Sequence, residues 1–157
     1  MKGIEPCLWF DVQAEQAAKF YTSIIKNSKI ENISYYGAEG PGEKGKVMTV
    51  TFKLNGQDFM ALNGGPIFKF TPPISLFVNC ENQVEVDELW EKLSEGGEKG
   101  QCGWLTDKYG ISWQIVPTIL GELMADKDTK KVESVMHAML QMTKLDIVKL
   151  KIAYDQG

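Results

Sequence analysis

The sequence predicts an α+β fold in which one β-α-β-β-β unit occurs twice and further helices follow. Two segments show the i, i+3, i+4, i+7 apolar spacing of a helix laid on a sheet, and the second lies 69 residues after the first (86 − 17). Their apolar positions are Ala17, Phe20, Tyr21 and Ile24, and Val86, Leu89, Trp90 and Leu93. A short apolar run precedes each helix and a hairpin pattern ends each unit, so we predict an internal duplication.

The first unit is predicted to span residues 1–65. Its expected elements are a strand at 4–10, a helix at about 13–25, and strands at 30–36, 47–54 and 57–63. Asn55-Gly56 joins the last two strands and is the strongest short-range hairpin pattern in the chain. The offset between the helices, applied to the first strand, aligns residues 6–10 with 75–79.

The second unit is predicted to span residues 72–117. Its expected elements are a strand at 74–80, a helix from Asn82 to about Ser94, and a hairpin at 102–117. Asn82 is a favoured residue type for a helix N-cap. Asp107 to Gly110 forms the hairpin loop, since Gly110 can adopt the positive φ that such turns need.

Gln114 is the residue of this hairpin with the clearest bearing on function. Strand alternation places Ser112, Gln114 and Val116 on one face, with Trp113 and Ile115 on the other. A glutamine among large apolar residues needs hydrogen-bond partners when it is removed from water. Either the protein or a ligand therefore supplies them.

Residues 118–157 are predicted to form a helical extension outside the repeat. The expected helices lie at about 118–125, from Asp128 or Thr129 to about 142, and from Thr143 to Tyr154. Thr143 followed by Asp146 has the spacing of a capping box. The apolar, Met-rich stripe of this extension must pack on its own domain or on a partner chain.

Composition excludes several classes of partner. The chain of 157 residues has a net charge of −4 and no cluster of Lys and Arg, so we expect no nucleic-acid partner. It lacks an apolar run of about 20 residues and the apolar core of a signal peptide, so we expect a cytoplasmic protein without a membrane partner. Cys7, Cys80 and Cys102 are expected to be reduced, and Cys102 is either a small buried hydrophobe or a reactive thiol.

Three stretches carry a resemblance to a known family. They are AEQAAKFY in the first helix, NGGPIFKF after the first unit, and CGWLTDKYGISWQIVP at the end of the second. With the duplicated βαβββ unit they resemble the PhnB-like branch of the vicinal oxygen chelate superfamily, which includes glyoxalase I, bleomycin-resistance proteins and extradiol dioxygenases. The resemblance covers about residues 4–117. It implies paired βαβββ modules whose curled mixed sheets surround a cleft, with helices outside, in a homodimer.

The resemblance also implies four positions at which the superfamily's enzymes hold a divalent metal through His, Gln or Glu. In this sequence they fall on Pro6 with Glu5 adjacent, on Met60 or Ala61, on Ser75 and on Gln114. A zinc or iron site needs three or more converging N, O or S donors, and this set does not supply them. We therefore expect no metal site and no cofactor.

The favoured hypothesis is a metal-independent binding protein for a small organic ligand in the cleft between the sheets. The expected ligand-binding residues are Trp9, Asn63, Phe68, Phe70, Ser75, Trp104 and Gln114, which combine aromatic surface with a few polar groups. One alternative is an enzyme of lyase, dioxygenase or isomerase type, either with a metal or metal-free with Glu5 as base. Another alternative is a structural, dimeric interaction protein.

A methyltransferase label is also attached to this family. Transfer of a methyl group from S-adenosylmethionine ordinarily uses a Gly-rich loop between a strand and a helix. The sequence after residue 63 has Gly64 and Gly65, but Pro66 follows and no helix begins there. We therefore do not expect this activity.

Overall fold

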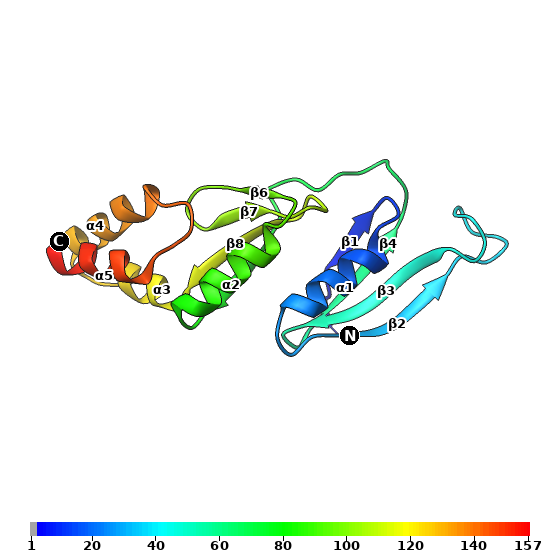
Figure 1. Ribbon diagram of the computed structural model, residues 1–157, viewed down its shortest axis with the longest axis horizontal. Coiled ribbons are helices and arrows are strands. Elements are labelled where there is room, and N and C mark those ends of the chain that lie inside the picture. The colour runs from blue at the N-terminus through cyan, green and yellow to red at the C-terminus, as the bar shows by residue number, and fades with distance from the viewer. Residues whose placement is uncertain (1–2) are drawn as a thin grey trace. The chain divides into compact units, whose positions relative to one another are not determined.

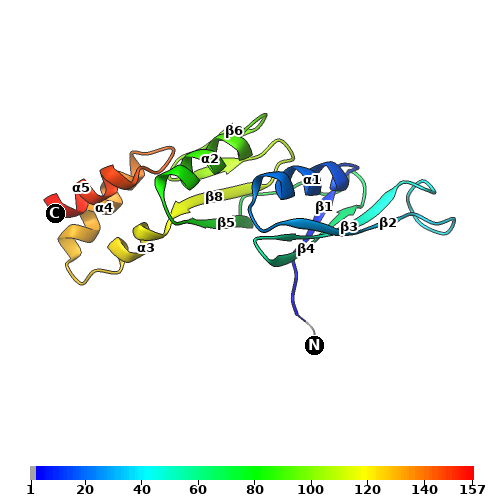
Figure 2. The same ribbon diagram turned by 60° about the horizontal axis from the view of Figure 1, so that its bottom comes forward.

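The computed structural model describes residues 3–157, and the chain divides into two compact units, Met1–Phe70 and Thr71–Gly157. Each unit contains a four-stranded mixed sheet, and three further helices end the second unit (Figure 1). This confirms the predicted α+β class with two βαβββ-like units and C-terminal helices. Neither sheet is strongly curled, in contrast to the curled sheets that the resemblance implied (Figure 2).

Unit 1 follows the predicted order of elements. They are β1 (Cys7–Phe10), α1 (Ala14–Ile24), β2 (Lys29–Tyr35), β3 (Val47–Leu54) and β4 (Gln57–Asn63). The sheet order is β1-β4-β3-β2, with β1 parallel to β4 and the other pairs antiparallel. Asn55 and Gly56 take φ values of 46° and 82° between β3 and β4, which is the geometry of the predicted two-residue hairpin turn.

One face of the unit 1 sheet and helix α1 form the core of that unit. The buried residues of the sheet include Leu8, Phe10, Val50, Phe52, Phe59 and Ala61. Ala17 and Tyr21 of α1 have no exposed surface, so the apolar stripe of the helix packs as its spacing predicted. The opposite face of the sheet carries Cys7, Trp9 and Met60, which are exposed or half-buried.

Unit 2 repeats this plan with shorter middle strands. Its elements are β5 (Ser75–Cys80), α2 (Gln83–Leu93), β6 (Glu98–Lys99), β7 (Trp104–Thr106) and β8 (Ser112–Pro117), and the sheet order is β5-β8-β7-β6. Asn82 caps α2 by accepting a hydrogen bond from the backbone N–H of Glu85 at 3.0 Å, as predicted. Trp113, Ile115 and Leu105 are buried on the sheet face that also carries Cys80.

The duplication is confirmed for the helices, but the strand alignment is wrong by one residue. Helix α2 begins 69 residues after α1 (83 − 14) and ends 69 residues after it (93 − 24). The strands are 70 residues apart, since Phe10 and Cys80 both end their strands on the buried face (80 − 10). The connection between strand and helix is one residue shorter in unit 2. Because strand side chains alternate, the predicted alignment therefore pairs each residue of β1 with a β5 residue on the opposite face.

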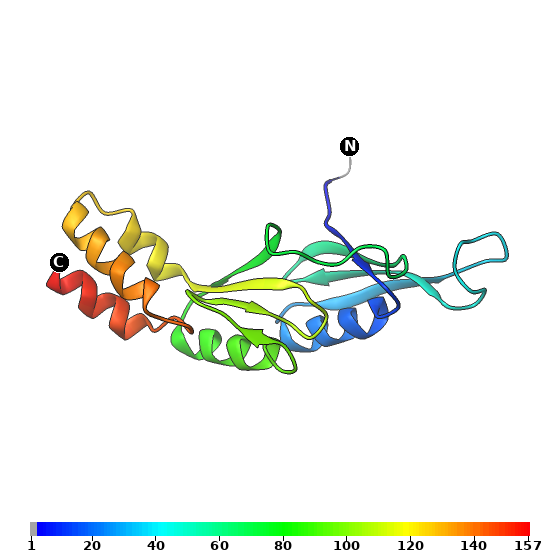
Figure 3. The same ribbon diagram turned by 90° about the horizontal axis from the view of Figure 1, so that it is seen from above.

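The extension consists of α3 (Thr118–Met124), α4 (Thr129–Leu140) and α5 (Ile147–Gln156), which lie together beyond the end of β8 (Figure 3). Its buried cluster is Val116, Leu120, Leu123, Val135, Met142, Leu145 and Leu150. Because Val116 belongs to β8, the extension packs on the sheet of its own unit. Asp128 caps α4, as one of the two predicted alternatives stated.

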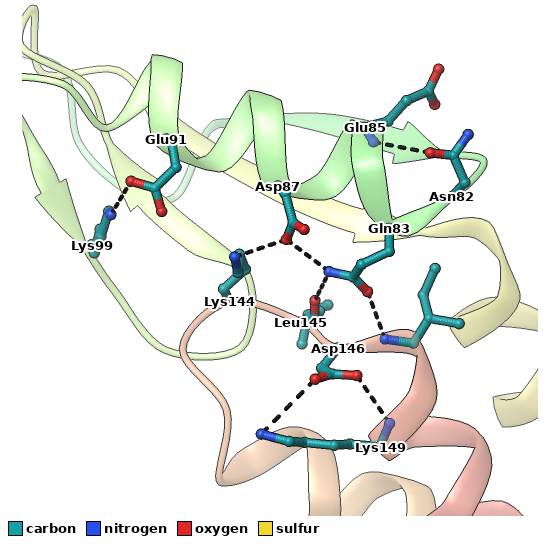
Figure 4. A network of polar contacts seen from close by, with 11 residues as sticks. Asn82, Gln83, Glu85, Asp87, Glu91, Lys99, Lys144, Leu145, Asp146 and Lys149 are labelled. Atoms are coloured by element: carbon teal, nitrogen blue, oxygen red, sulfur yellow. Dashed lines mark hydrogen bonds and ion pairs between the residues drawn. The ribbon is translucent and has the colours of Figure 1, made fainter.

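The connection between α4 and α5 is tied to helix α2 (Figure 4). Gln83 donates to the carbonyl of Leu145 at 3.0 Å and accepts from the backbone N–H of Ile147 at 2.8 Å. Lys144 pairs with Asp87 at 2.8 Å. Asp146 is the N-cap of α5 and accepts from the backbone N–H of Lys149 at 3.1 Å, so the predicted helix start at Thr143 is wrong.

No helix within residues 3–157 is both long enough and apolar enough to span a membrane.

Candidate functional site

The face of the unit 2 sheet that carries Gln114 is not covered by α2 and presents two rows of side chains across its strands. In the first row, Phe77 of β5 and Trp104 of β7 are the register partners of Gln114 on β8. In the second row, Asn79 of β5 is the partner of Val116. Phe77 is 53 % exposed, while Trp104 and Gln114 are half-buried. The sheet thus places an amide between two aromatic rings.

Gln114 finds one of its hydrogen-bond partners in the protein. Its Nε2 donates to the hydroxyl oxygen of Ser75 at 2.9 Å. Within residues 3–157 no other partner is recorded for its side chain, and no buried side-chain nitrogen or oxygen lacks one. The carbonyl oxygen of Gln114, which has no partner in the protein, is therefore not buried and is able to accept a hydrogen bond from a ligand.

A pocket of about 270 Å³ opens on these two rows. The sheet contributes Phe77, Asn79, Trp104, Gln114 and Val116, and the segments that flank it contribute Cys102, Pro117, Thr118, Leu120, Gly121 and Met139. No carboxylate, ammonium or guanidinium group is among these lining residues. An apolar, aromatic concavity with a few amide and hydroxyl groups is the usual composition of a small-molecule site.

The predicted hairpin began at Cys102, but in the structure this residue lies outside the strands, and β7 begins at Trp104. Cys102 occupies a turn with a φ of 56° and is half-buried, and its Sγ donates to the carbonyl of Met139 at 3.6 Å. Its backbone N–H donates to the carbonyl of Met142 at 2.8 Å. The thiol therefore lies at the contact between the hairpin and the extension and lines the pocket.

The predicted aromatic residues of unit 1 make their contacts within that unit. Trp9 donates from Nε1 to the carbonyl of Gly65 at 2.9 Å and meets Phe68 edge to face with ring centroids 5.1 Å apart. Phe70 makes a similar contact with Phe10, also at 5.1 Å, and so extends the core of unit 1. Phe68 is 62 % exposed and is the member of this group most available to a ligand.

Asn63 has a structural role that the sequence did not reveal. Its Oδ1 accepts from the backbone N–H of Ala14 at 2.8 Å, and its Nδ2 donates to the carbonyl of Val47 at 3.0 Å. Helix α1 has no side-chain cap from Gln13, so Asn63 satisfies the first N–H of the helix from the neighbouring strand. Its carbonyl also accepts from the Tyr36 hydroxyl. Asn63 thus holds α1, β4 and the residue 36–47 loop together.

The corrected strand alignment changes the residues at the superfamily's metal positions. Gln114 corresponds to Met60, because the paired register Phe77–Gln114 matches Cys7–Met60. The same register makes Glu5, and not Pro6, the counterpart of Ser75. Glu5 is exposed, and its carboxylate acts on the Cys7 thiol, whose pKa is raised first by burial and then by this charge.

The donor set at these positions does not fit a bound metal. Glu5 and Met60 offer one carboxylate and one thioether, while Ser75 and Gln114 are neutral and bonded to each other. Among the described residues, no three His, Cys, Asp or Glu side chains come close enough to hold an ion. The chemistry of these residues gives no basis for a step through a metal.

The glycine pair after β4 does not fit S-adenosylmethionine either. A Cβ at Gly64 would lie 2.2 Å from the Trp9 ring, so the indole occupies the space beside this glycine. Gly65 uses its carbonyl to accept from Trp9. No helix follows, and the next regular element is β5. The two glycines serve the packing of Trp9, and no step of methyl transfer is derived through them.

Comparisons with known proteins identify the family of the chain. The profile of the family described as 3-demethylubiquinone-9 3-methyltransferase matches residues 2–116. The PhnB protein of Bacillus cereus is 40 % identical over 74 % of this chain and all of its own, with a TM-score of 0.69. A Pseudomonas aeruginosa protein is 21 % identical over 74 % of this chain and 98 % of its own, with a TM-score of 0.62.

A fosfomycin resistance protein of Listeria monocytogenes, solved with Mn(II) and sulfate, shares the fold at 16 % identity and a TM-score of 0.51, over 72 % of this chain and 89 % of its own. No curated protein matches the chain. The chain therefore belongs to the family described as 3-demethylubiquinone-9 3-methyltransferase, to which the PhnB protein of Bacillus cereus is also assigned by its description.

Proposed function

We propose that this protein binds a small organic molecule without a metal, in the pocket on the open face of the unit 2 sheet. The observation that carries the proposal is the position of Gln114. Its amide lies between Phe77 and Trp104, donates one hydrogen bond to Ser75, and keeps its carbonyl for a ligand in a pocket of about 270 Å³. A cleft shared by the two sheets, which the family resemblance implies, stays a prediction.

The donor set at the four superfamily positions supports metal independence. Ser75 and Gln114 occupy two of the four positions that the resemblance assigns to metal ligands. They are hydrogen-bonded to each other, and neither side chain carries a charge. A neutral hydrogen-bonding pair supports ligand recognition and does not supply a Lewis acid. A metal-free enzyme with Glu5 as base is less well supported, because Glu5 is exposed and lies in the other unit.

A thermal-shift screen of metabolites, repeated after treatment with a chelator, tests the proposal. A ligand that binds only the folded protein raises the melting temperature, and the rise should survive the chelator. Gln114→Ala should weaken binding about tenfold, since one hydrogen bond contributes about 1 kcal/mol. Thr106→Ala, on the same sheet but outside the pocket, is the matched control.

Two results would overturn the proposal. One is the absence of any compound that raises the melting temperature. The other is a stabilising compound whose effect disappears with the chelator and returns with a divalent metal. A Gln114→Ala variant that loses stability but binds normally would assign Gln114 a purely structural role.

A further inference from the structure

Part of the pocket wall comes from outside the region that defines the family. The family profile ends at residue 116, whereas Pro117, Thr118, Leu120, Gly121 and Met139 all line the pocket. They belong to the end of β8 and to helices α3 and α4. The sheet therefore provides the floor with Gln114, and the extension provides the facing wall.

This wall is fixed to the sheet at several points. The backbone N–H groups of Cys102 and Gly103 donate to the carbonyls of Met142 and Thr143 at 2.8 and 2.7 Å. Gln83 holds the start of α5 from the other side of the α4–α5 connection (Figure 4). Leu120 is buried in the same cluster as Val116. A wall held in this way has a defined shape and can select ligands by size.

The composition and volume of the pocket indicate the class of ligand. No charged side chain lines it, so a charged ligand group would lose water without gaining an opposite charge. A cavity of about 150 Å³ holds benzene, so about 270 Å³ suits a molecule of bicyclic size. A lactam presents an N–H beside its carbonyl, and this N–H can donate to the accessible carbonyl of Gln114.

We propose that the C-terminal extension is the specificity-determining wall of this pocket, and that with Gln114 it selects a neutral, planar, bicyclic-sized molecule bearing a lactam-like group. This inference rests on the proposed function and adds the ligand class and the role of the extension. Gly121 is the residue that tests it most directly. Gly121 lines the pocket, and a Cβ there would meet no atom within 4 Å, so a larger side chain is accommodated without displacing its neighbours.

The experiment measures binding of 2-quinolone, a bicyclic lactam, by calorimetry to the full chain and two variants. Gly121→Leu should weaken binding at least tenfold by filling the pocket. Glu122→Leu places the same side chain on the next, exposed position of α3, outside the pocket, and should leave binding unchanged. Quinoline-2-carboxylate should bind at least tenfold more weakly than 2-quinolone, because its charge is uncompensated. Melting temperatures confirm that both variants are folded.

Alkylation of the thiols gives an independent readout. Bound 2-quinolone should slow the reaction of Cys102, which lines the pocket, and leave that of exposed Cys7 unchanged. Binding that depends on Gln114 but is unaffected by Gly121→Leu, with no protection of Cys102, would overturn the role of the extension and leave the proposed function standing. Failure of 2-quinolone to bind while another compound binds through Gln114 would overturn the ligand class.

Discussion

The indole Nε1 of Trp113 donates a hydrogen bond to Oδ2 of Asp107 at 2.8 Å, and both residues are at most 3 % exposed. The other carboxylate oxygen accepts from the backbone N–H groups of Tyr109 and Ile111 at 2.8 and 3.1 Å. Asp107 thus closes the turn between β7 and β8 and fixes the orientation of Trp113. The strand that carries Gln114 depends on this turn for its register.

Asp107→Ala should lower the free energy of unfolding by about 3 kcal/mol, because it leaves buried N–H donors without an acceptor. Asp107→Asn should lower it less, since one side-chain oxygen remains. Chemical denaturation followed by tryptophan fluorescence measures both. Lys108→Ala, at the exposed next position, is the control and should change stability by less than about 0.5 kcal/mol. Equal stabilities of Asp107→Ala and Lys108→Ala would contradict this role.

The sequence identified the periodic parts of the fold well. Helices α1 and α2, the Asn55-Gly56 turn and the Asn82 cap all followed from local spacing and residue type. The strand alignment failed because Cys7–Phe10 is apolar at every position, so its sequence does not show which alternate residues are buried. Only the burial of Phe10 and Cys80 decides the offset between the two strands.

The candidate site was predicted in part. Ser75, Trp104 and Gln114 were singled out in the sequence, and Trp104 and Gln114 line one pocket. Asn63 was expected at a ligand, which stays a prediction, and it also caps α1. The sequence did not show the cap, because a long-range contact across 49 residues leaves no local pattern. The wall formed by Gly121 and Met139 was missed for the same reason. A helical stripe shows that a face is covered and does not show what else it contacts.

The homodimer implied by the family resemblance stays a prediction of the sequence. Large apolar side chains are exposed in both units, among them Ile67 in unit 1 and Ile74 in unit 2, at 76 % and 82 %. Apolar surface of this kind is commonly covered in an assembly. Light scattering at micromolar concentration should give twice the chain mass of 17.6 kDa. A mass of 17.6 kDa, unchanged on concentration, would contradict the prediction.

Gly64→Ala should destabilise unit 1, because its Cβ would lie 2.2 Å from the Trp9 ring. Overpacking of this kind costs about 1–3 kcal/mol. The cost should vanish in a Trp9→Ala background, where the ring is absent, and a double-mutant cycle measures this coupling. Gly37→Ala is the control, since a Cβ there meets no atom within 4 Å. Additive effects of Gly64→Ala and Trp9→Ala on the free energy of unfolding would show that the Trp9 indole is not the reason why residue 64 must be glycine.

The ion pair between Asp87 and Lys144 should make the attachment of the extension depend on pH. Hydrogen bonds from Lys144 and then from Gln83 hold the pKa of the Asp87 carboxyl below its ordinary value of 3.8. Because the folded-state pKa is the lower one, the stabilisation is fully present above the ordinary value and is lost as pH falls through the folded-state pKa. The side chains of Lys144 and Asp87 are 36 % and 46 % exposed, so solvent screening keeps the contribution of the ion pair to the free energy of unfolding below about 1 kcal/mol.

Melting temperatures of the wild type and Asp87→Asn test this between about pH 6 and about pH 2. The wild type should be more stable near pH 6, and the difference should shrink towards zero at the acid end. Glu88→Gln is the control, because Glu88 pairs at 3.8 Å with Lys92 on its own helix and not with the extension. Equal stabilities near pH 6 would mean that Asp87 acts through its hydrogen bond with Gln83, which an amide retains, and not through its charge. A difference that persists at the lowest pH would also contradict a role of the charge.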